Sequence, residues 1–306
     1  TEIYTLSLHD ALPIYAANVF LRCATRILVR VAGFTVRTFA DLERRIAEVD
    51  WDDWIGAGDS PRFRVTSRNS ELWHDGAVTQ RFEAALGTPV EGAREQLVVV
   101  RAVNDRFTVS VDSSGAPLHE RGWRQAIAKA PLRESVAAGL LVAAGWDPTT
   151  PLVDPMCGSG TIAIEAALLA GGVAPAAGRE LAFRFWPGFE PGTWARVAAE
   201  IQRRRTDAAD PPPIMAVDRD AGAADSARAN ADRAGAAPLI EWLNSPTAAP
   251  ERPDGTDRRP GLPVATPLSG RPPAGSALPH TFPPFGPVAS AGVAGCSPGR
   301  LVPARP

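Results

Sequence analysis

Residues 151–170, PLVDPMCGSGTIAIEAALLA, constrain the fold more than any other stretch of this 306-residue chain. Residues 151–153 end a short apolar run that indicates a buried strand, residues 154–160 form an acidic, glycine-rich turn, and residues 161–170 favour a helix. A strand, a glycine turn and a helix in this order lead into nucleotide-type sites at the carboxyl ends of parallel strands. The sequence therefore predicts an α/β fold with a parallel sheet.

The turn contains the residue types that a ligand-binding loop needs. Gly158 and Gly160 lack a β-carbon, so a ligand can approach the main chain closely. The helix that follows presents free N–H groups at its start. Asp154, at the end of the strand, is placed to accept hydrogen bonds from a cationic or hydroxylated ligand. The alternative is that the glycines serve packing alone, and the GxGxxG spacing of a dinucleotide fingerprint is absent.

A second carboxylate follows in residues 214–236, IMAVDRDAGAADSARANADRAGA. This segment predicts a strand that ends at Asp218 and then a helix. A carboxylate at the end of the second strand is placed to accept hydrogen bonds from the two hydroxyls of a ribose. Asp220 is better suited to cap the helix, and the open alternative is that both aspartates only cap it.

The string DPMCGSGT, followed by an Ile-Glu-Ala-Ala helix, resembles motif I of the class I S-adenosylmethionine (SAM) methyltransferases. It is most similar to the bacterial rRNA large subunit methyltransferase K/L-like family, whose members carry a THUMP RNA-binding domain. The resemblance implies a Rossmann-like methyltransferase domain with SAM as cofactor and no metal. It implies that a single cavity, sized for an adenosyl sulfonium, is surrounded by Asp154, Pro155, Cys157, Gly158, Gly160 and Asp218.

Residues 15–112 alternate strand and helix patterns. LVVVRAV and RFTVSVD predict two antiparallel strands joined at Asn104-Asp105. This α+β region resembles a THUMP domain fused to part of a ferredoxin-like domain, which implies binding to structured RNA mainly through the RNA backbone. We expect Arg64 and Arg68 to contact RNA; the alternative is an ordinary solvated face.

Residues 117–146 connect the two halves, and HERGWRQAIAKAPLRESV resembles the family segment beside the cofactor pocket and the RNA. Basic residues around Trp123 suit phosphate contact plus stacking; the alternative is a linker with a charged helix start. The helix that follows is predicted to turn Val136, Leu140 and Leu141 to the core. The basic residues expected to contact RNA are Arg121, Arg124 and Lys129.

The composition limits the partners. A net charge of −2 gives no global basic signature, so any RNA contact must come from local patches. The cysteines Cys23, Cys157 and Cys296 show no metal-ligand spacing and favour a reducing, cytoplasmic compartment. No apolar run has membrane-spanning length. We expect RNA as the partner, rRNA first and tRNA second, and no membrane.

The two ends of the chain differ from the rest. Residues 1–14, TEIYTLSLHDALPI, resemble a translated sequencing-adapter sequence, and we expect them to be non-native; the alternative is a genuine first strand. Between the ends, the predicted domains are a THUMP/ferredoxin-like region at 15–112 and a partial methyltransferase domain at 113–245. Residues 246–306, rich in Pro, Ala, Gly, Ser and Arg, are predicted to be a disordered, frameshifted tail.

The chain departs from the family after residue 243. The family requires a fourth strand that ends in Asn-Pro-Pro-Tyr or Asn-Pro-Pro-Phe, whose Asn holds the target amine in line with the methyl group. No Asn-Pro-Pro string exists in this chain. A frame offset near residues 261–264 would restore Asn-Pro-Pro-Phe-Gly from the codons of residues 265–270, whereas the alternative is a native disordered tail.

The resemblance therefore implies a SAM-dependent RNA methyltransferase, acting on guanine N2 of large-subunit rRNA. As written, the chain holds no catalytic residue of the expected motif and is expected to be inactive. A tRNA guanine-N2 methyltransferase is the alternative within the same chemistry, and a DNA methyltransferase disagrees with the THUMP-like half. A non-catalytic RNA-binding fragment is the alternative outside enzymes.

Overall fold

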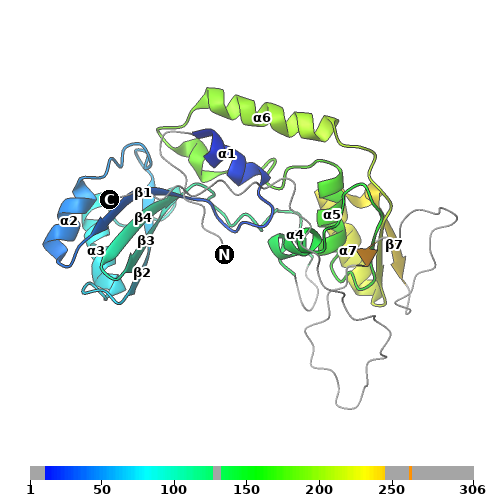
Figure 1. Cartoon of the computed structure of the whole chain (residues 1–306), viewed down its shortest axis with the longest axis horizontal. Coiled ribbons are helices and arrows are strands. Elements are labelled where there is room, and N and C mark those ends of the chain that lie inside the picture. The colour runs from blue at the N-terminus through cyan, green and yellow to red at the C-terminus, as the bar shows by residue number, and fades with distance from the viewer. Residues whose placement is uncertain (1–10, 127–131, 245–261, 264–306) are drawn as a thin grey trace, which may run out of the picture. The chain divides into compact units, whose positions relative to one another are not determined.

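The computed structural model describes residues 11–126, 132–244 and 262–263 (Figure 1). The α-helices are α1 (Ala11–Phe20), α2 (Phe39–Ala47), α3 (Asp75–Leu86), α4 (Glu134–Ala143), α5 (Thr161–Ala170), α6 (Pro191–Thr206) and α7 (Ala221–Ala234). Two 3₁₀-helices are η1 (Ala182–Phe185) and η2 (Ala237–Leu239). The strands are β1 (Leu28–Thr35), β2 (Ser60–Arg68), β3 (Glu95–Val103), β4 (Arg106–Asp112), β5 (Leu152–Asp154), β6 (Ile214–Asp218), β7 (Ile240–Asn244) and β8 (Leu262–Pro263).

The first sheet is mixed and has the strand order β1-β4-β3-β2. β2 runs parallel to β3, and the other two pairs are antiparallel. Along β3, alternate side chains are buried, and Val98 and Val100 pack in one core cluster with Phe107 of β4, Leu42 of α2 and Phe82 of α3. Figure 1 shows α2 and α3 together beside this sheet. The hydrophobic period of two therefore gives the sheet one face for the helices and one for polar side chains.

The predicted turn between β3 and β4 is confirmed. Asn104 and Asp105 have φ angles of +51° and +64°, the left-handed values of the two-residue turn that matches strand twist. Asp105 also accepts hydrogen bonds from Glu71 N at 2.7 Å and from Arg37 Nε at 2.8 Å. The turn thus holds two neighbouring loops besides joining its strands.

The second sheet is parallel and has the order β7-β6-β5-β8. Its core cluster includes Leu152 of β5, Ile214 of β6, and Ile162 and Ile164 of α5. From β5 the chain proceeds outward through β6 and β7, whereas β8 lies on the other side of β5. The strand order therefore reverses at β5, and in open α/β sheets ligands bind at the carboxyl ends of the strands beside such a reversal.

Helix α1 packs into an aromatic cluster. The ring of Tyr15 stacks on Phe183 with centroids 4.2 Å apart, and Ile14 is 3% exposed in the same core. The helix begins at Ala11, so it runs across the boundary predicted at residue 14. Residues 1–10 lie outside the described residues, and the non-native origin of residues 1–14 stays a prediction.

Helix α4 corrects the predicted core face. Leu141 is buried as expected, but Val136 and Leu140 are 47% and 37% exposed. The buried face is Glu134, Ala137, Ala138 and Leu141, which follows the spacing of a helix that begins at Glu134. The prediction was wrong for two positions because the inward face carries small residues and Glu134, whose buried carboxylate is bound by Arg124 at 3.0 Å, so apolar spacing alone did not mark this face.

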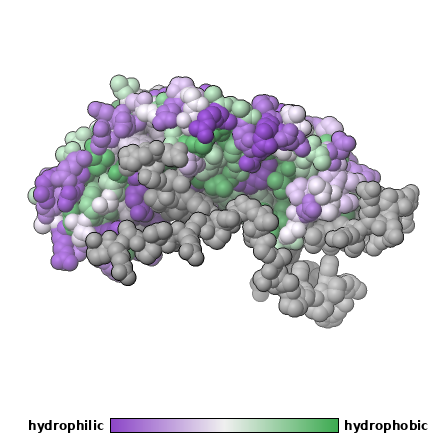
Figure 2. Space-filling model, turned by 45° about the horizontal axis from the view of Figure 1, so that its top comes forward, coloured by the Kyte–Doolittle hydropathy of each residue, from purple (hydrophilic) through white to green (hydrophobic). Residues whose placement is uncertain are grey.

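Strand β8 corrects the predicted tail. Residues 246–306 were expected to lack regular structure, but Leu262–Pro263 pairs in parallel with β5. The open edge of a strand offers unpaired N–H and C=O groups, so an extended segment can pair with it. The other residues of this segment lie outside the described residues. No helix in the described part of the chain is long and apolar enough to cross a membrane, and Figure 2 shows hydrophilic and hydrophobic residues interspersed over the visible face.

Candidate functional site

The first carboxylate of the candidate site, Asp154, lies at the carboxyl end of β5 and is 1% exposed. Its Oδ1 accepts a hydrogen bond from Met156 N at 3.4 Å. Burial raises the pKa of Asp154 to about 7, the Met156 N–H opposes that shift, and the nearby Asp218 carboxylate adds to it. A buried carboxyl that interacts with a second carboxylate is a functional-site candidate.

The second carboxylate, Asp218, ends the neighbouring strand β6. Its Oδ2 accepts a hydrogen bond from Gly158 N at 2.9 Å, and its Oδ1 accepts one from Asp220 N at 2.9 Å. Cys157 N donates to Val217 O at 2.9 Å. These contacts hold the loop against the end of β6, so the loop and both carboxylates meet at one edge of the sheet. A carboxylate has about four acceptor positions, so Asp218 keeps capacity for a ligand's hydroxyls.

The two glycines of the loop have different roles. Gly158 has a φ of +54°, and a β-carbon there would meet nothing within 4 Å, so the main chain is open to an approaching ligand. Gly160 has a φ of +79°, and a β-carbon there would lie 3.0 Å from Ala227 Cβ and 3.1 Å from the ring of Trp242. The prediction of an open approach fits Gly158. At Gly160 the packing alternative is correct, because α7 and β7 fill the space.

The other predicted cofactor-binding residues of the loop are Cys157 and Pro155. Cys157 is 7% exposed within the core cluster of the second sheet. Burial raises the pKa of its thiol, so this side chain is a neutral packing group. Pro155 is half-buried and follows Asp154 directly in the turn. Among the described residues, no group of three or more His, Cys, Asp or Glu side chains could hold a metal ion.

Asn230 of α7 is a site residue whose role the sequence did not reveal. It is fully buried, and its Oδ1 accepts hydrogen bonds from Gln125 N at 3.2 Å and Ala126 N at 3.1 Å. Its Nδ2 donates to Ser159 O at 3.2 Å and to Ala126 O at 2.9 Å. Asn230 therefore ties the glycine loop to α7 and to the connecting segment. The available signal was an asparagine inside a helix, where its side chain is unfavourable without a tertiary partner.

A buried ionic triad holds the helix that follows the loop. Glu165 of α5 is fully buried, and its carboxylate binds Arg22 at 3.2 Å and Arg121 at 3.1 Å. Arg121 also donates to Leu118 O and to Arg22 O, both at 2.7 Å. Since Arg121 is 9% exposed and uses its donors inside the protein, the prediction that it contacts RNA is wrong. Its charge is balanced by Glu165.

The other predicted RNA contacts have three different outcomes. The Arg124 side chain is 17% exposed and is paired with the buried Glu134, so it holds the start of α4. Lys129 lies outside the described residues. Arg64 and Arg68 are exposed and lie two strand repeats apart on the same face of β2. Of the predicted RNA contacts, Arg64 and Arg68 are thus the ones that the structure leaves exposed.

Replacing Asp154 with Asn is expected to stabilise the ligand-free protein at pH 8 but not at pH 4. The folded-state pKa of about 7 lies above the ordinary value of 3.8, so the folded protein keeps a proton that the unfolded chain releases. The stability from that proton is complete below pH 4 and is lost as the pH rises through 7. The amide does not ionise, so the free energy of unfolding of the variant should exceed that of the wild type by up to roughly 4 kcal/mol more at pH 8 than at pH 4. Denaturant unfolding from pH 4 to pH 8 measures this difference in the free energy of unfolding, and a difference that does not change with pH would contradict the raised pKa.

The parallel sheet that reverses at β5, with an acidic residue at the ends of β5 and β6, defines an α/β protein of the class I methyltransferase type. Residues 121–252 match the RMKL-like methyltransferase domain.

Three known proteins show the extent of this similarity. The "Putative RNA methyltransferase YpsC" of Bacillus subtilis (strain 168) is 32% identical over 247 residues, which are 76% of this chain and 63% of YpsC. The chain thus spans less than two thirds of that relative. A structure described as a "predicted N6-adenine-specific DNA methylase" from Listeria monocytogenes str. 4b F2365 is 31% identical, with a TM-score of 0.72 over 85% of this chain and 70% of its own. A structure described as "SMU.472, a putative methyltransferase complexed with SAH" is 26% identical, with a TM-score of 0.69 over 84% of this chain and 70% of its own.

Proposed function

We propose that this chain is built as a SAM-dependent RNA methyltransferase for guanine N2, with large-subunit rRNA as the leading substrate and tRNA as the second. The observation that carries the proposal is the meeting of Asp154, Asp218 and the glycine loop at the ends of adjacent parallel strands. Two findings on relatives support it: YpsC is named as an RNA methyltransferase, and SMU.472 was crystallised with SAH, the product form of SAM.

Each residue of the loop has a task in this proposal. Asp218 accepts hydrogen bonds from the ribose hydroxyls with the acceptor positions that Gly158 N and Asp220 N leave open. The missing side chain of Gly158 lets the methionine part lie against the main chain. Asp154, buried beside the loop, attracts the ammonium group. The bound sulfonium supplies a methyl group that is already reactive, so the protein's remaining work is to orient the two reactants.

The RNA half of the proposal rests on the first sheet. We assign residues 15–112 to a THUMP/ferredoxin-like RNA-binding region, with Arg64 and Arg68 as contacts to the RNA backbone. Both arginines are exposed on β2. A chain of net charge −2 needs such a local basic surface to hold a polyanion.

The transfer step is the part that this chain lacks. β8 lies beside β5, on the side opposite to β6, and ends at Pro263. We assign β8 to the fourth strand, after which the family carries Asn-Pro-Pro, whereas here the sequence continues as Val264-Ala265-Thr266-Pro267. The position of β8 supports the proposed frame offset at residues 261–264. Sequencing the contiguous genomic DNA tests it, and a locus with no alternative frame encoding Asn-Pro-Pro would refute the offset.

Replacing Asp218 with Ala is expected to weaken SAH binding at least about tenfold, because the ribose loses a charged hydrogen-bond acceptor worth about 1.5 to 3 kcal/mol. Isothermal titration calorimetry with SAH measures this without requiring transfer. Asp225→Asn is the matched control, since Asp225 is 78% exposed on α7 and is paired only with Arg228 among the described residues. Undetectable SAH binding by the folded wild type, or equal affinities in both variants, would count against the site.

A second candidate function is RNA binding without methyl transfer, which the absence of Asn-Pro-Pro favours. Transfer from tritiated SAM to rRNA, tRNA and DNA separates the candidates when the chain is compared with a version whose reading frame is restored. The enzyme proposal expects N2-methylguanine in RNA from the restored version alone. N6-methyladenine in DNA would instead support the activity named for the Listeria structure.

A further inference from the structure

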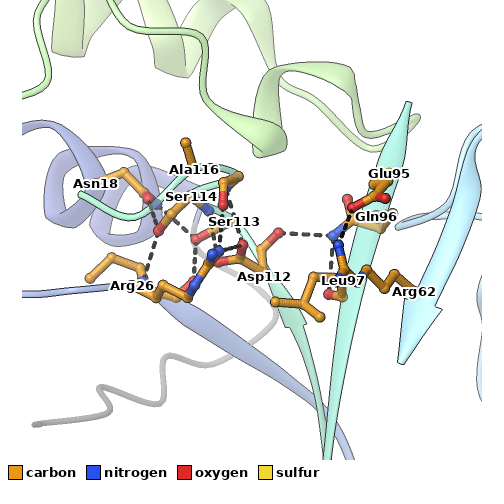
Figure 3. Close-up of polar contacts among 12 residues, drawn as sticks. Asn18, Arg26, Arg62, Glu95, Gln96, Leu97, Asp112, Ser113, Ser114 and Ala116 are labelled. Carbon is orange, nitrogen blue, oxygen red and sulfur yellow. Dashed lines mark hydrogen bonds and ion pairs between the residues drawn. The ribbon is translucent and has the colours of Figure 1, made fainter. Parts of the chain in front are cut away.

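A cavity of about 390 Å³ lies at one end of the first sheet and includes no residue of the candidate cofactor site. Three guanidinium groups line it, from Arg26, Arg62 and Arg64. Its carboxylates are Glu95 and Asp112, and the main chain at residues 115–116 closes one side. Figure 3 shows two of these arginines with their carboxylate partners, Arg26 directed at Asp112 and Arg62 at Glu95. The cavity thus holds three guanidinium groups against two carboxylates.

Asp112 is already fully engaged inside the protein. It is 1% exposed, and its carboxylate accepts hydrogen bonds from Ser114 N and Gly115 N at 3.1 Å each, besides its ion pair with Arg26. Arg26 uses only Nη1 for that pair and for the carbonyl of Gly115. Among the described residues its Nε and Nη2 have no partner, so Asp112 fixes a guanidinium whose other donors are still available.

The other two arginines are less restrained. Arg62 binds Glu95 at 3.0 Å, but both side chains are more than half exposed, and such surface pairs contribute about 0 to 1 kcal/mol. Arg64 has no ion pair or hydrogen bond within the described part of the chain. A ligand with several negatively charged oxygens can therefore replace Glu95 as the partner of Arg62 and engage Arg64.

Further arginines lie on the face of the first sheet that carries Arg64. The strand register places Arg64 of β2, Val99 of β3, Ser110 of β4 and Arg30 of β1 in one row across all four strands. Side chains paired across strands share a face, and this face is opposite to the one that packs on α2 and α3. Further arginines on this face are Arg68, Arg101 and Arg106.

We propose that this cavity binds a phosphate group of the RNA backbone, with Arg26 as the fixed donor and Arg62 and Arg64 as the groups that close on the oxygens. Guanidinium groups suit phosphate because their planar fork donates two parallel hydrogen bonds. The arginine row extends from the cavity and would contact the following phosphates. The RNA part of this inference rests on the proposed function; the anion site itself rests on the cavity alone. Inorganic phosphate shares the chemistry and is the other source to be tested.

The test compares two double variants, R62Q/R64Q in the cavity and R44Q/R45Q on the exposed outer side of α2. Each removes two positive charges, and Arg26 stays in place because its loss would leave Asp112 buried without a counter-charge. Binding of a structured rRNA fragment is measured by fluorescence anisotropy at several salt concentrations. R62Q/R64Q should weaken binding at least about tenfold and lower the salt slope by about 1.5 to 2, whereas R44Q/R45Q should change affinity less than about twofold.

Equal losses in the two double variants would mean unspecific attraction and would overturn the proposal, as would no loss in either. Titration with inorganic phosphate alone, followed by NMR of the arginine Nε–H groups, examines the anion site directly. Shifts confined to Arg26, Arg62 and Arg64 support it, and shifts spread over all surface arginines contradict it. If free phosphate binds there but RNA does not compete, the RNA assignment is wrong. R62Q/R64Q is expected to bind SAH with the affinity of the wild type in calorimetry. This measurement therefore tests the cofactor site independently of the anion site.

Discussion

Replacing Glu165 with Leu is expected to lower the free energy of unfolding by about 3 to 5 kcal/mol, because breaking a buried ion pair leaves its partners uncompensated. Two buried guanidinium groups would remain beside the middle of α5, since the Arg22 and Arg121 side chains are 12% and 2% exposed. Denaturant unfolding followed by circular dichroism measures the loss. Glu165→Gln should cost less than the leucine variant, because the amide keeps one hydrogen-bond acceptor.

Glu200 provides the matched control for this prediction. It also binds two arginines, Arg203 at 2.8 Å and Arg204 at 2.7 Å, but those side chains are 62% and 50% exposed on α6. Exposed pairs of this kind contribute about 0 to 1 kcal/mol each, so Glu200→Leu should have a small effect. Equal losses in the Glu165 and Glu200 variants would show that burial does not decide the value of the triad.

The triad also explains why part of the site could not be predicted. Arg121 looked like an RNA contact because its neighbours along the chain are basic and aromatic. Its actual partner, Glu165, lies 44 positions later, and Arg22, the third member, lies 143 positions before Glu165. A periodic pattern reports which residues share one face of one element, but not which distant side chain meets them. The contacts of Asn230 could not be predicted for the same reason, since all but one of the partners described for its side chain lie in other segments.

The local signals, in contrast, were reliable. The strand, glycine turn and helix at residues 151–170 form as predicted, because each is specified by neighbouring residues: the apolar run, the small residues, and a run of helix formers. The turn at Asn104-Asp105 and the helix cap at Asp220 are confirmed on the same grounds. Helix α4 shows the limit, because its inward face includes the buried Glu134, paired with Arg124, which apolar spacing does not reveal.

Replacing Gly160 with Val is expected to cost about 2 to 5 kcal/mol of folding stability, from overpacking and from the left-handed backbone together. At a φ of +79°, a β-carbon would lie 3.0 Å from Ala227 Cβ and 3.1 Å from the ring of Trp242, and valine adds two methyl groups in that space. α7 or β7 would have to move away from the loop. Denaturant unfolding measures the cost, and SAH calorimetry shows whether the displaced loop still binds.

Gly158→Ala separates the two glycines of the loop. Its φ of +54° also disfavours a side chain, but a β-carbon there would meet nothing within 4 Å. The alanine variant should therefore lose only about 1 to 2 kcal/mol of stability, while SAH binding weakens because the methyl group occupies the ligand's approach to the main chain. If Gly158→Ala binds SAH with the affinity of the wild type, the ligand does not lie on this side of the loop. Equal stability losses in Gly158→Ala and Gly160→Val would show that backbone conformation, rather than the packing of α7 and β7, requires glycine at both positions.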